Sequence, residues 1–118
     1  MGSAIKDVTD ASFQADVLQA PGPVVVYFWS RQSGDRLGLA QGEVPGDYNP
    51  QATIVRLNVD QNPQTWNTYR ETDDRTYDVP DLPVLMMFKQ GKPAAAQGQP
   101  MPLLIPQALL DMFIGRNI

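Results

Sequence analysis

The stretch Val24-Val25-Val26-Tyr27-Phe28-Trp29 decides the fold, because it is an unbroken run of β-branched and aromatic residues. Such a run predicts a β-strand that is covered on both faces, rather than one that alternates between core and solvent. We therefore expect this strand to lie centrally in a sheet.

The remaining sequence predicts one domain over residues 1–118, in which helices alternate with strands. A first helix is expected to begin at Thr9 or Asp10, which suit an N-cap, and to end at Pro21-Gly22-Pro23. Further elements are expected in this order: a short helix around residues 36–43, a strand over 53–59, a helix from Pro63 through Arg70, a strand over 84–88, a turn at Gln90-Gly91, an edge strand over 93–97, and a helix that starts near Pro106 and ends at Gly115. Met86 and Met87 fall within one of these strands, so we expect them in the core.

Composition excludes several classes of function. The 118 residues contain neither cysteine nor histidine, so thiol nucleophiles, imidazole bases and the usual zinc ligands are missing. We expect no metal and no cofactor. The net charge is −4 and the Lys and Arg residues are scattered, which argues against binding to nucleic acid or an anionic membrane.

The sequence contains no apolar run long enough to span a bilayer, and its N-terminus lacks the hydrophobic region of a signal peptide. A cytoplasmic protein is therefore the default expectation. Met1-Gly2-Ser3 is equally consistent with the replacement of a removed leader.

Four segments, in the right order, resemble thioredoxins. Val8–Phe13 is similar to the entry of the family's first helix, Val24–Ser30 to its central strand, Val55–Pro63 to its third strand and following turn, and Leu82–Gly91 to its cis-proline segment and hairpin. The resemblance implies a thioredoxin fold: a mixed α/β sheet of four to five strands with helices on both faces. Ser33-Gly34-Asp35-Arg36 stands where a thioredoxin carries Cys-Gly-Pro-Cys.

The same resemblance indicates that the redox chemistry is gone. Thiol–disulfide exchange needs an attacking thiolate and a second, resolving thiol, and this chain has no cysteine. The family's buried carboxylate and nearby lysine, which manage the protons of exchange, correspond here to Tyr27 and Arg56. We therefore expect a protein that is not an enzyme, with no catalytic residues and degenerate active-site positions at Ser33, Gly34, Asp35 and Arg36.

A binding role survives these losses. Pro83 matches the family's cis-proline, whose neighbouring backbone binds an extended substrate segment as an added strand, and this mode needs no cysteine. The expected peptide-binding groove consists of Trp29, Ser33, Leu82, Pro83 and Gly98. The alternative is that Pro83 is a structural turn and Trp29 a packed aromatic residue.

The extra residues Glu71–Thr76 border this groove. We expect them to modulate selectivity in favour of apolar segments flanked by Lys or Arg. Four nearby carboxylates lack the spacing of a calcium loop, so a solvated loop is the expectation for Asp73, Asp74, Asp78 and Asp81.

Within the thioredoxins, the run Phe28-Trp29-Ser30-Arg31-Gln32-Ser33 resembles that of bacterial chaperedoxins. This likeness implies a chaperone-like protein that holds unfolded or oxidation-damaged polypeptide without a covalent bond. The helical-repeat region into which chaperedoxins continue is not part of these 118 residues. Two alternatives stay open: a scaffold or assembly factor for one specific protein partner, and a hydrolase that uses Ser33, although a helix N-cap is the simpler role for that residue.

Overall fold

The computed structural model describes residues 5–31, 51–72, 75–98 and 106–117. The helix expected around residues 36–43 lies outside these ranges. The described elements, in chain order, are β1 (Lys6–Asp7), a π-helical turn η1 (Gln14–Leu18), β2 (Val24–Trp29), β3 (Thr53–Asn58), α1 (Pro63–Tyr69), a 3₁₀ turn η3 (Val79–Asp81), β4 (Val84–Lys89), β5 (Lys92–Gln97) and α2 (Pro106–Asn117).

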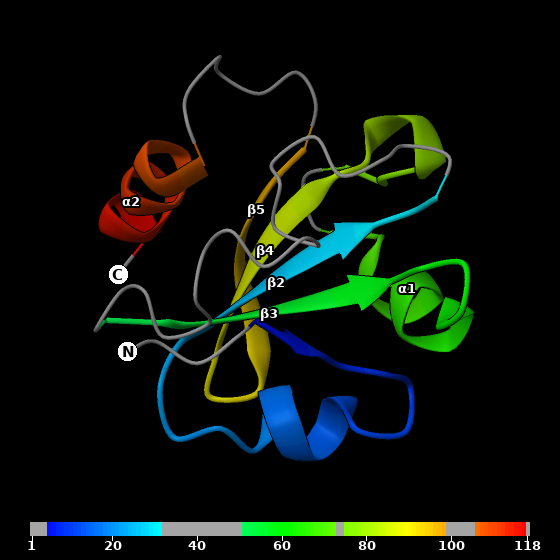
Figure 1. The fold of residues 1–118 in the computed structure, drawn as a ribbon, viewed down its shortest axis with the longest axis horizontal. Coiled ribbons are helices and arrows are strands. Elements are labelled where there is room, and N and C mark those ends of the chain that lie inside the picture. Colours follow the sequence, from blue (N-terminus) through cyan, green and yellow to red (C-terminus); the bar gives the residue numbers. More distant parts are fainter. Residues whose placement is uncertain (1–4, 32–50, 73–74, 99–105, 118) are drawn as a thin grey trace.

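The strands form a mixed five-stranded sheet in the order β1-β3-β2-β4-β5 (Figure 1). β2 is central: it pairs in parallel with β3 and antiparallel with β4. β3 also pairs in parallel with β1, and β4 with the antiparallel β5. The predicted thioredoxin-like α/β sheet, with an apolar strand over residues 24–29 at its centre, is therefore confirmed.

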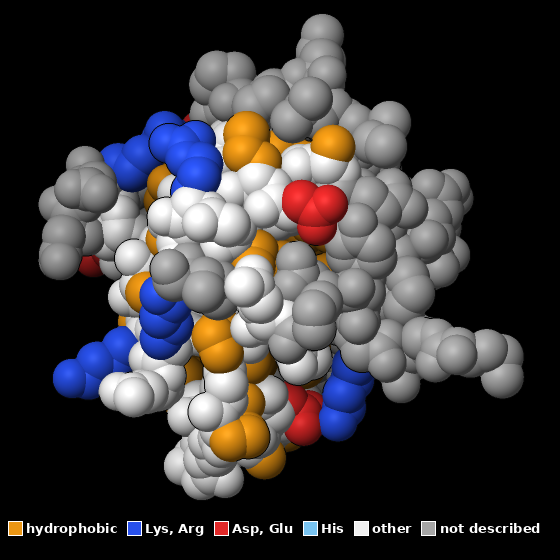
Figure 2. All heavy atoms as spheres, turned by 90° about the vertical axis from the view of Figure 1, so that its left-hand side faces the viewer, with side chains coloured by type: hydrophobic (Ala, Val, Ile, Leu, Met, Phe, Trp, Pro, Cys, Tyr) orange, Lys and Arg blue, Asp and Glu red, His pale blue; other side chains and the backbone are white. Residues whose placement is uncertain are grey.

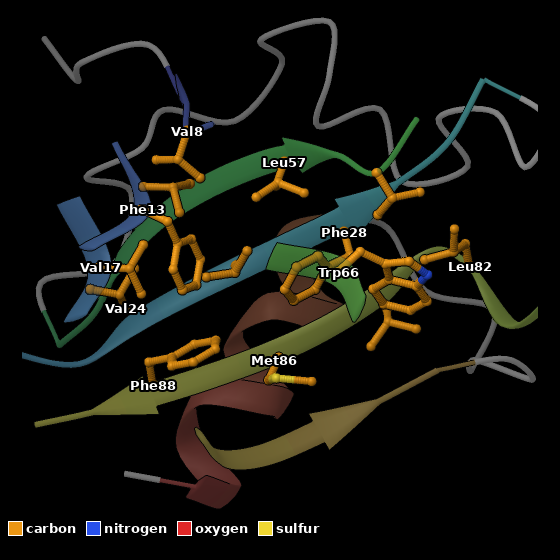
Figure 3. Packing of buried hydrophobic residues seen from close by; sticks show 14 of the residues in the cluster. Val8, Phe13, Val17, Val24, Phe28, Leu57, Trp66, Leu82, Met86 and Phe88 are labelled. Carbon is orange, nitrogen blue, oxygen red and sulfur yellow. The ribbon is translucent and has the colours of Figure 1, made fainter. Parts of the chain in front are cut away.

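Each face of the sheet carries its own hydrophobic core, because successive side chains of a strand point to opposite faces. Val24, Val26 and Phe28 of β2 pack in one core, on the side of η1 and α1 (Figure 3). Val25 and Tyr27 pack in the other, on the side of α2. Met86 and Met87 are fully buried, one in each core, as the sequence predicts.

Aromatic rings fill the core on the side of η1. Phe88 of β4 meets Phe13 and Tyr69 edge-on, with ring centroids 5.3 and 5.0 Å apart. Phe28 packs against Trp66 of α1 at 5.4 Å. Partial burial of Tyr69 raises the pKa of its phenol above the ordinary value. These contacts fix α1 against the sheet near the end of β2.

Asp10 caps a different helix from the one expected. Its carboxylate accepts hydrogen bonds from the backbone amides of Thr65 (2.8 Å) and Gln64 (3.3 Å) in the first turn of α1. Burial alone would raise the pKa of Asp10, but hydrogen bonds from the Thr65 side chain and from both amides hold that pKa below its ordinary value. Thr9 serves the first helical turn instead, because its Oγ1 accepts from the amide of Ser12 at 3.1 Å.

Two local expectations have opposite outcomes. The hairpin turn at Gln90-Gly91 is confirmed, with both residues at positive φ (54° and 78°). The predicted end of the last helix at Gly115 is wrong, because α2 continues to Asn117. Gly115 is exposed and has no neighbour within 4 Å of a hypothetical Cβ, so glycine costs the helix only backbone entropy, and two more residues remain helical.

The surface gives little sign of large apolar patches on the face drawn in Figure 2. Hydrophobic atoms appear there in small separate groups among polar atoms, and Lys and Arg side chains stand at several separate points. Among the described helices, none is long and apolar enough to cross a membrane.

Candidate functional site

Three parts of the expected groove meet at one end of the sheet. The antiparallel register of β2 and β4 pairs Phe28 with Val84, so the next positions along it are Trp29 and Pro83. The register of β4 and β5 pairs Leu85 with Gln97, which brings Gly98 opposite Val84. The topology thus gathers Trp29, Leu82, Pro83 and Gly98, while Ser33 and the neighbouring positions Gly34, Asp35 and Arg36 lie outside the described residues.

Leu82 and Pro83 contribute the backbone of the expected groove directly before β4. The peptide bond between them is cis. Both residues are buried, and Leu82 belongs to the core on the η1 side (Figure 3). β4 begins at the next residue, Val84, so Pro83 stands directly before this strand.

The indole nitrogen of Trp29 is a buried polar atom that bears directly on what this site could bind. Its side chain is partly buried against the core on the α2 side. The indole Nε1 is buried and has no hydrogen-bond partner within the part of the chain that the structure describes. A buried donor without an acceptor costs about 1–3 kcal/mol. An acceptor brought by a bound molecule would remove this cost.

Gly98 is held by packing. A Cβ at this position would lie 2.9 Å from Cε1 of Tyr77 and 3.3 Å from Cγ2 of Val84. Contacts under 3.0 Å are not tolerated, so any side chain would displace the buried Tyr77 ring. The absence of a side chain at position 98 therefore leaves room for the Tyr77 ring to pack at the start of β4.

Tyr27 and Arg56, which stand at the positions of the thioredoxin carboxylate and lysine that manage protons, lie in one row across the sheet. Tyr27, Arg56 and Asp7 lie side by side on β2, β3 and β1. Tyr27 is fully buried, and Arg56 makes a two-pronged ion pair with Asp7, with Nε–Oδ1 at 2.5 Å and Nη2–Oδ2 at 3.0 Å. The guanidinium is thus turned to the carboxylate at the sheet edge, and β1, which the sequence did not predict, supplies that carboxylate.

The chain leaves β2 through a polar corner. Ser30 is fully buried, and the amide of Arg31 donates to Oδ2 of Asp60 at 2.9 Å. The amide of Asp60 in turn donates to Asn58 Oδ1 at 2.9 Å. These contacts fix the point from which the chain continues toward residues 33–36.

The segment between α1 and the site is a tight hairpin, which we call the 70–77 hairpin. Glu71 and Thr76 form an antiparallel bridge, and the amide of Tyr77 donates to the carbonyl of Arg70 at 2.8 Å. The guanidinium of Arg75 lies 4.5 Å from the centroid of the Tyr77 ring, a cation–π contact.

The carboxylates near this hairpin are partly neutralised. Arg70 forms an ion pair with Asp78, and Arg75 one with Asp81 at 2.9 Å. Asp73 and Asp74 lie outside the described residues. Within those residues, no cluster of carboxylates has the arrangement of a metal site. Two of the four carboxylates of the expected acidic loop thus have arginine partners, eight and six places away in sequence, and Asp78 is exposed.

The mixed sheet, the helices on both faces and the cis-proline directly before β4 define an α/β protein of the thioredoxin-like class. The chain is 37% identical over 99 residues to a thioredoxin of Pseudomonas aeruginosa, which covers 82% of this chain and 84% of that protein. It is 37% identical over 95 residues to a thioredoxin of Rhodospirillum rubrum (79% and 84%), and 34% over 113 residues to one of Streptomyces clavuligerus (87% and 98%). No family model matches the chain.

This chain belongs to the thioredoxin family. It has no cysteine, so it lacks the thiols with which that family reduces disulfides.

Proposed function

We propose that this protein binds polypeptide without a covalent bond, as a chaperone-like, redox-inactive member of the thioredoxin family. The proposed binding site is the groove of Trp29, Leu82, Pro83 and Gly98, to which the resemblance to thioredoxins adds Ser33. The observation that carries the proposal is the buried, unpartnered Nε1 of Trp29 beside the register position of Pro83.

A peptide added as a strand needs a backbone edge and a few side-chain contacts, and none of these depends on sulfur. Main-chain hydrogen bonds supply affinity, and apolar side chains supply local contact. A carbonyl of the bound segment would also accept the indole N–H of Trp29 once a local movement exposes this buried atom. The frame around Pro83 is thus suited to binding although the chemistry of exchange is gone.

The residues at positions 27 and 56 support a role that does not involve redox chemistry. A thioredoxin that had lost only its cysteines would keep a buried carboxylate at position 27 and a lysine at 56. Here a buried tyrosine stands at the first position, and Arg56 is committed to Asp7. Loss of the cysteines and of this pair together fits a protein retained for binding.

The chaperone-like role rests on the likeness of residues 28–33 to chaperedoxins. It is tested by diluting three unrelated unfolded clients from denaturant and following aggregation by light scattering. We expect suppression that rises with the concentration of this protein for all three clients. Trp29→Ala should weaken client binding by about 1–3 kcal/mol while circular dichroism shows an intact fold.

Met112→Ala is the matched control for that variant. Met112 is also partly buried and packs against the same core as Trp29, but it lies on α2 rather than on β2 or β4. Its truncation should leave suppression unchanged. Absence of suppression together with one stoichiometric partner in a pull-down would favour a scaffold, and covalent labelling of Ser33 by a serine-reactive probe would favour a hydrolase.

A further inference from the structure

A second surface lies at the other side of the site, along the free edge of β5. β5 is the last strand of the described sheet and pairs only with β4. In an antiparallel pair, every second residue directs its N–H and C=O away from its partner. Lys92 and Pro93, residues that guard sheet edges against pairing, stand at the beginning of β5, whereas Ala94–Gln97 carries no charge and no proline.

A hollow of about 220 Å³ borders this edge on the side of η1 and α1. Its walls are Glu71, Thr72 and Tyr77 of the 70–77 hairpin, with Met86 beneath and residues 93–96 of β5 alongside. Glu71 is exposed and, within the described residues, makes no side-chain ion pair. This hollow therefore offers one negative charge.

A second hollow, of about 310 Å³, borders the same edge near the end of α2. It is lined by Ala96 and Gln97 of β5 and by Phe113, Arg116 and Asn117 of α2. Asn117 donates to the carbonyl of Phe113 at 2.7 Å, and Arg116 is exposed without an ion pair among the described residues. This hollow therefore offers one positive charge.

The first hollow is smaller than the pockets of about 300–1,000 Å³ that hold small molecules, and the second only just reaches that range, so each suits a single side chain better than a whole ligand. Ala96 belongs to both linings, and neighbouring side chains of an extended segment point to opposite faces of a sheet. A strand laid along β5 would therefore send one side chain toward Glu71 and the adjacent one toward Arg116.

We propose that the free edge of β5 docks an extended polypeptide segment in which a Lys or Arg is followed or preceded directly by an Asp or Glu. The basic side chain enters the Glu71 hollow and the acidic one enters the Arg116 hollow. The segment becomes a sixth strand, held by the outward backbone groups of residues 94–97. This surface is separate from the groove at Pro83, and its occupancy does not depend on the proposed function of that groove.

The test uses two synthetic peptides of eight residues built from Val and Thr. The first carries adjacent Lys and Glu at its centre. The second has the same composition with Lys and Glu two positions apart, so that both face one side of a strand. Titration of the ¹⁵N-labelled protein should shift the amides of Ala94–Gln97 with the first peptide, and the second should bind more weakly.

Glu71→Gln and Arg116→Gln should each weaken the first peptide about two- to fivefold, the range of an exposed ion pair. Lys89→Gln, a charge change at the far end of the β4–β5 hairpin, is the matched control and should have no effect. Trp29→Ala should also have none, which separates this surface from the groove. Equal affinity for both peptides, or shifts that spare residues 94–97, would overturn the proposal, and so would a dimer in sedimentation whose interface covers this edge.

Discussion

Replacing Trp29 by phenylalanine is predicted to leave stability nearly unchanged and yet to weaken polypeptide binding. The change removes a buried, unpartnered N–H, which relieves about 1–3 kcal/mol of desolvation cost. It also shrinks a partly buried ring and loses roughly 1 kcal/mol or more of packing. Because these effects have opposite signs, the free energy of unfolding should change by no more than about 1 kcal/mol.

Trp66→Phe is the matched control, since it makes the same chemical change in the opposite core. Trp66 is 6% exposed, packs against Phe28, and its Nε1 is not among the unpartnered buried atoms. Shrinking the Trp66 ring loses packing without removing an unpartnered buried N–H, so we expect the free energy of unfolding to fall by about 1–2 kcal/mol. Urea unfolding followed by circular dichroism compares the two variants, with equal slopes required for the comparison.

Binding provides the second half of this prediction. If a client carbonyl accepts the indole N–H, Trp29→Phe loses a hydrogen bond worth about 0.5–1.5 kcal/mol, which is roughly a two- to thirteenfold loss of affinity. Equal destabilisation by Trp29→Phe and Trp66→Phe would refute the reasoning, because Nε1 would then have a partner within the protein. Unchanged affinity for an unfolded client would show that this donor does not face the bound chain.

Three further variants test the account at other points. Asp10→Ala should lower the free energy of unfolding by about 1 kcal/mol at pH 7. Because the folded-state pKa of Asp10 lies below its ordinary value of 3.8, the charge-dependent part of this difference should vanish as pH falls through the folded-state pKa. Thermal unfolding between pH 7 and pH 2 measures the difference, and a difference that grows in acid would contradict the role of Asp10 as a cap. Gly98→Ala should cost about 1–3 kcal/mol by displacing Tyr77, and a neutral effect on the urea midpoint would mean that the ring moves freely. Ser33→Cys with Arg36→Cys should give at most weak insulin reduction in a turbidity assay with dithiothreitol, whereas near-normal turnover would show that the lost carboxylate and lysine were irrelevant.

The sequence predicted the elements whose pattern is local. Val24–Trp29 was assigned with the bounds that the structure has, because every residue in it is apolar and no turn residue interrupts the run. The hairpin at Gln90-Gly91 was equally clear from its turn residues. The end of α2 was misplaced because glycine at an exposed position lowers helix propensity without forcing a stop.

Features that depend on distant partners were missed. β1 has only two residues and exists through its parallel pairing with Val55 and Arg56. The sequence offers both Thr9 and Asp10 as caps of the nearest helix, but the amide partners of Asp10 lie 54 and 55 residues further along the chain. For the candidate site, the resemblance points to Trp29, Leu82, Pro83 and Gly98, which the sheet register brings to one end of the sheet. No sequence pattern signals an unpartnered indole nitrogen, because that depends on the packing around it.

The most direct test of the central claim is an NMR titration of the ¹⁵N-labelled protein with a reduced, unfolded client polypeptide. The account predicts that the indole Nε1–H and backbone amide of Trp29 shift together with the amides of Leu82 and Gly98, and that the indole signal moves as expected for a newly formed hydrogen bond. Shifts confined to the face of α2 around Leu109 and Phe113 would contradict it, because the client would then bind away from Pro83 and the groove would have no part in the function.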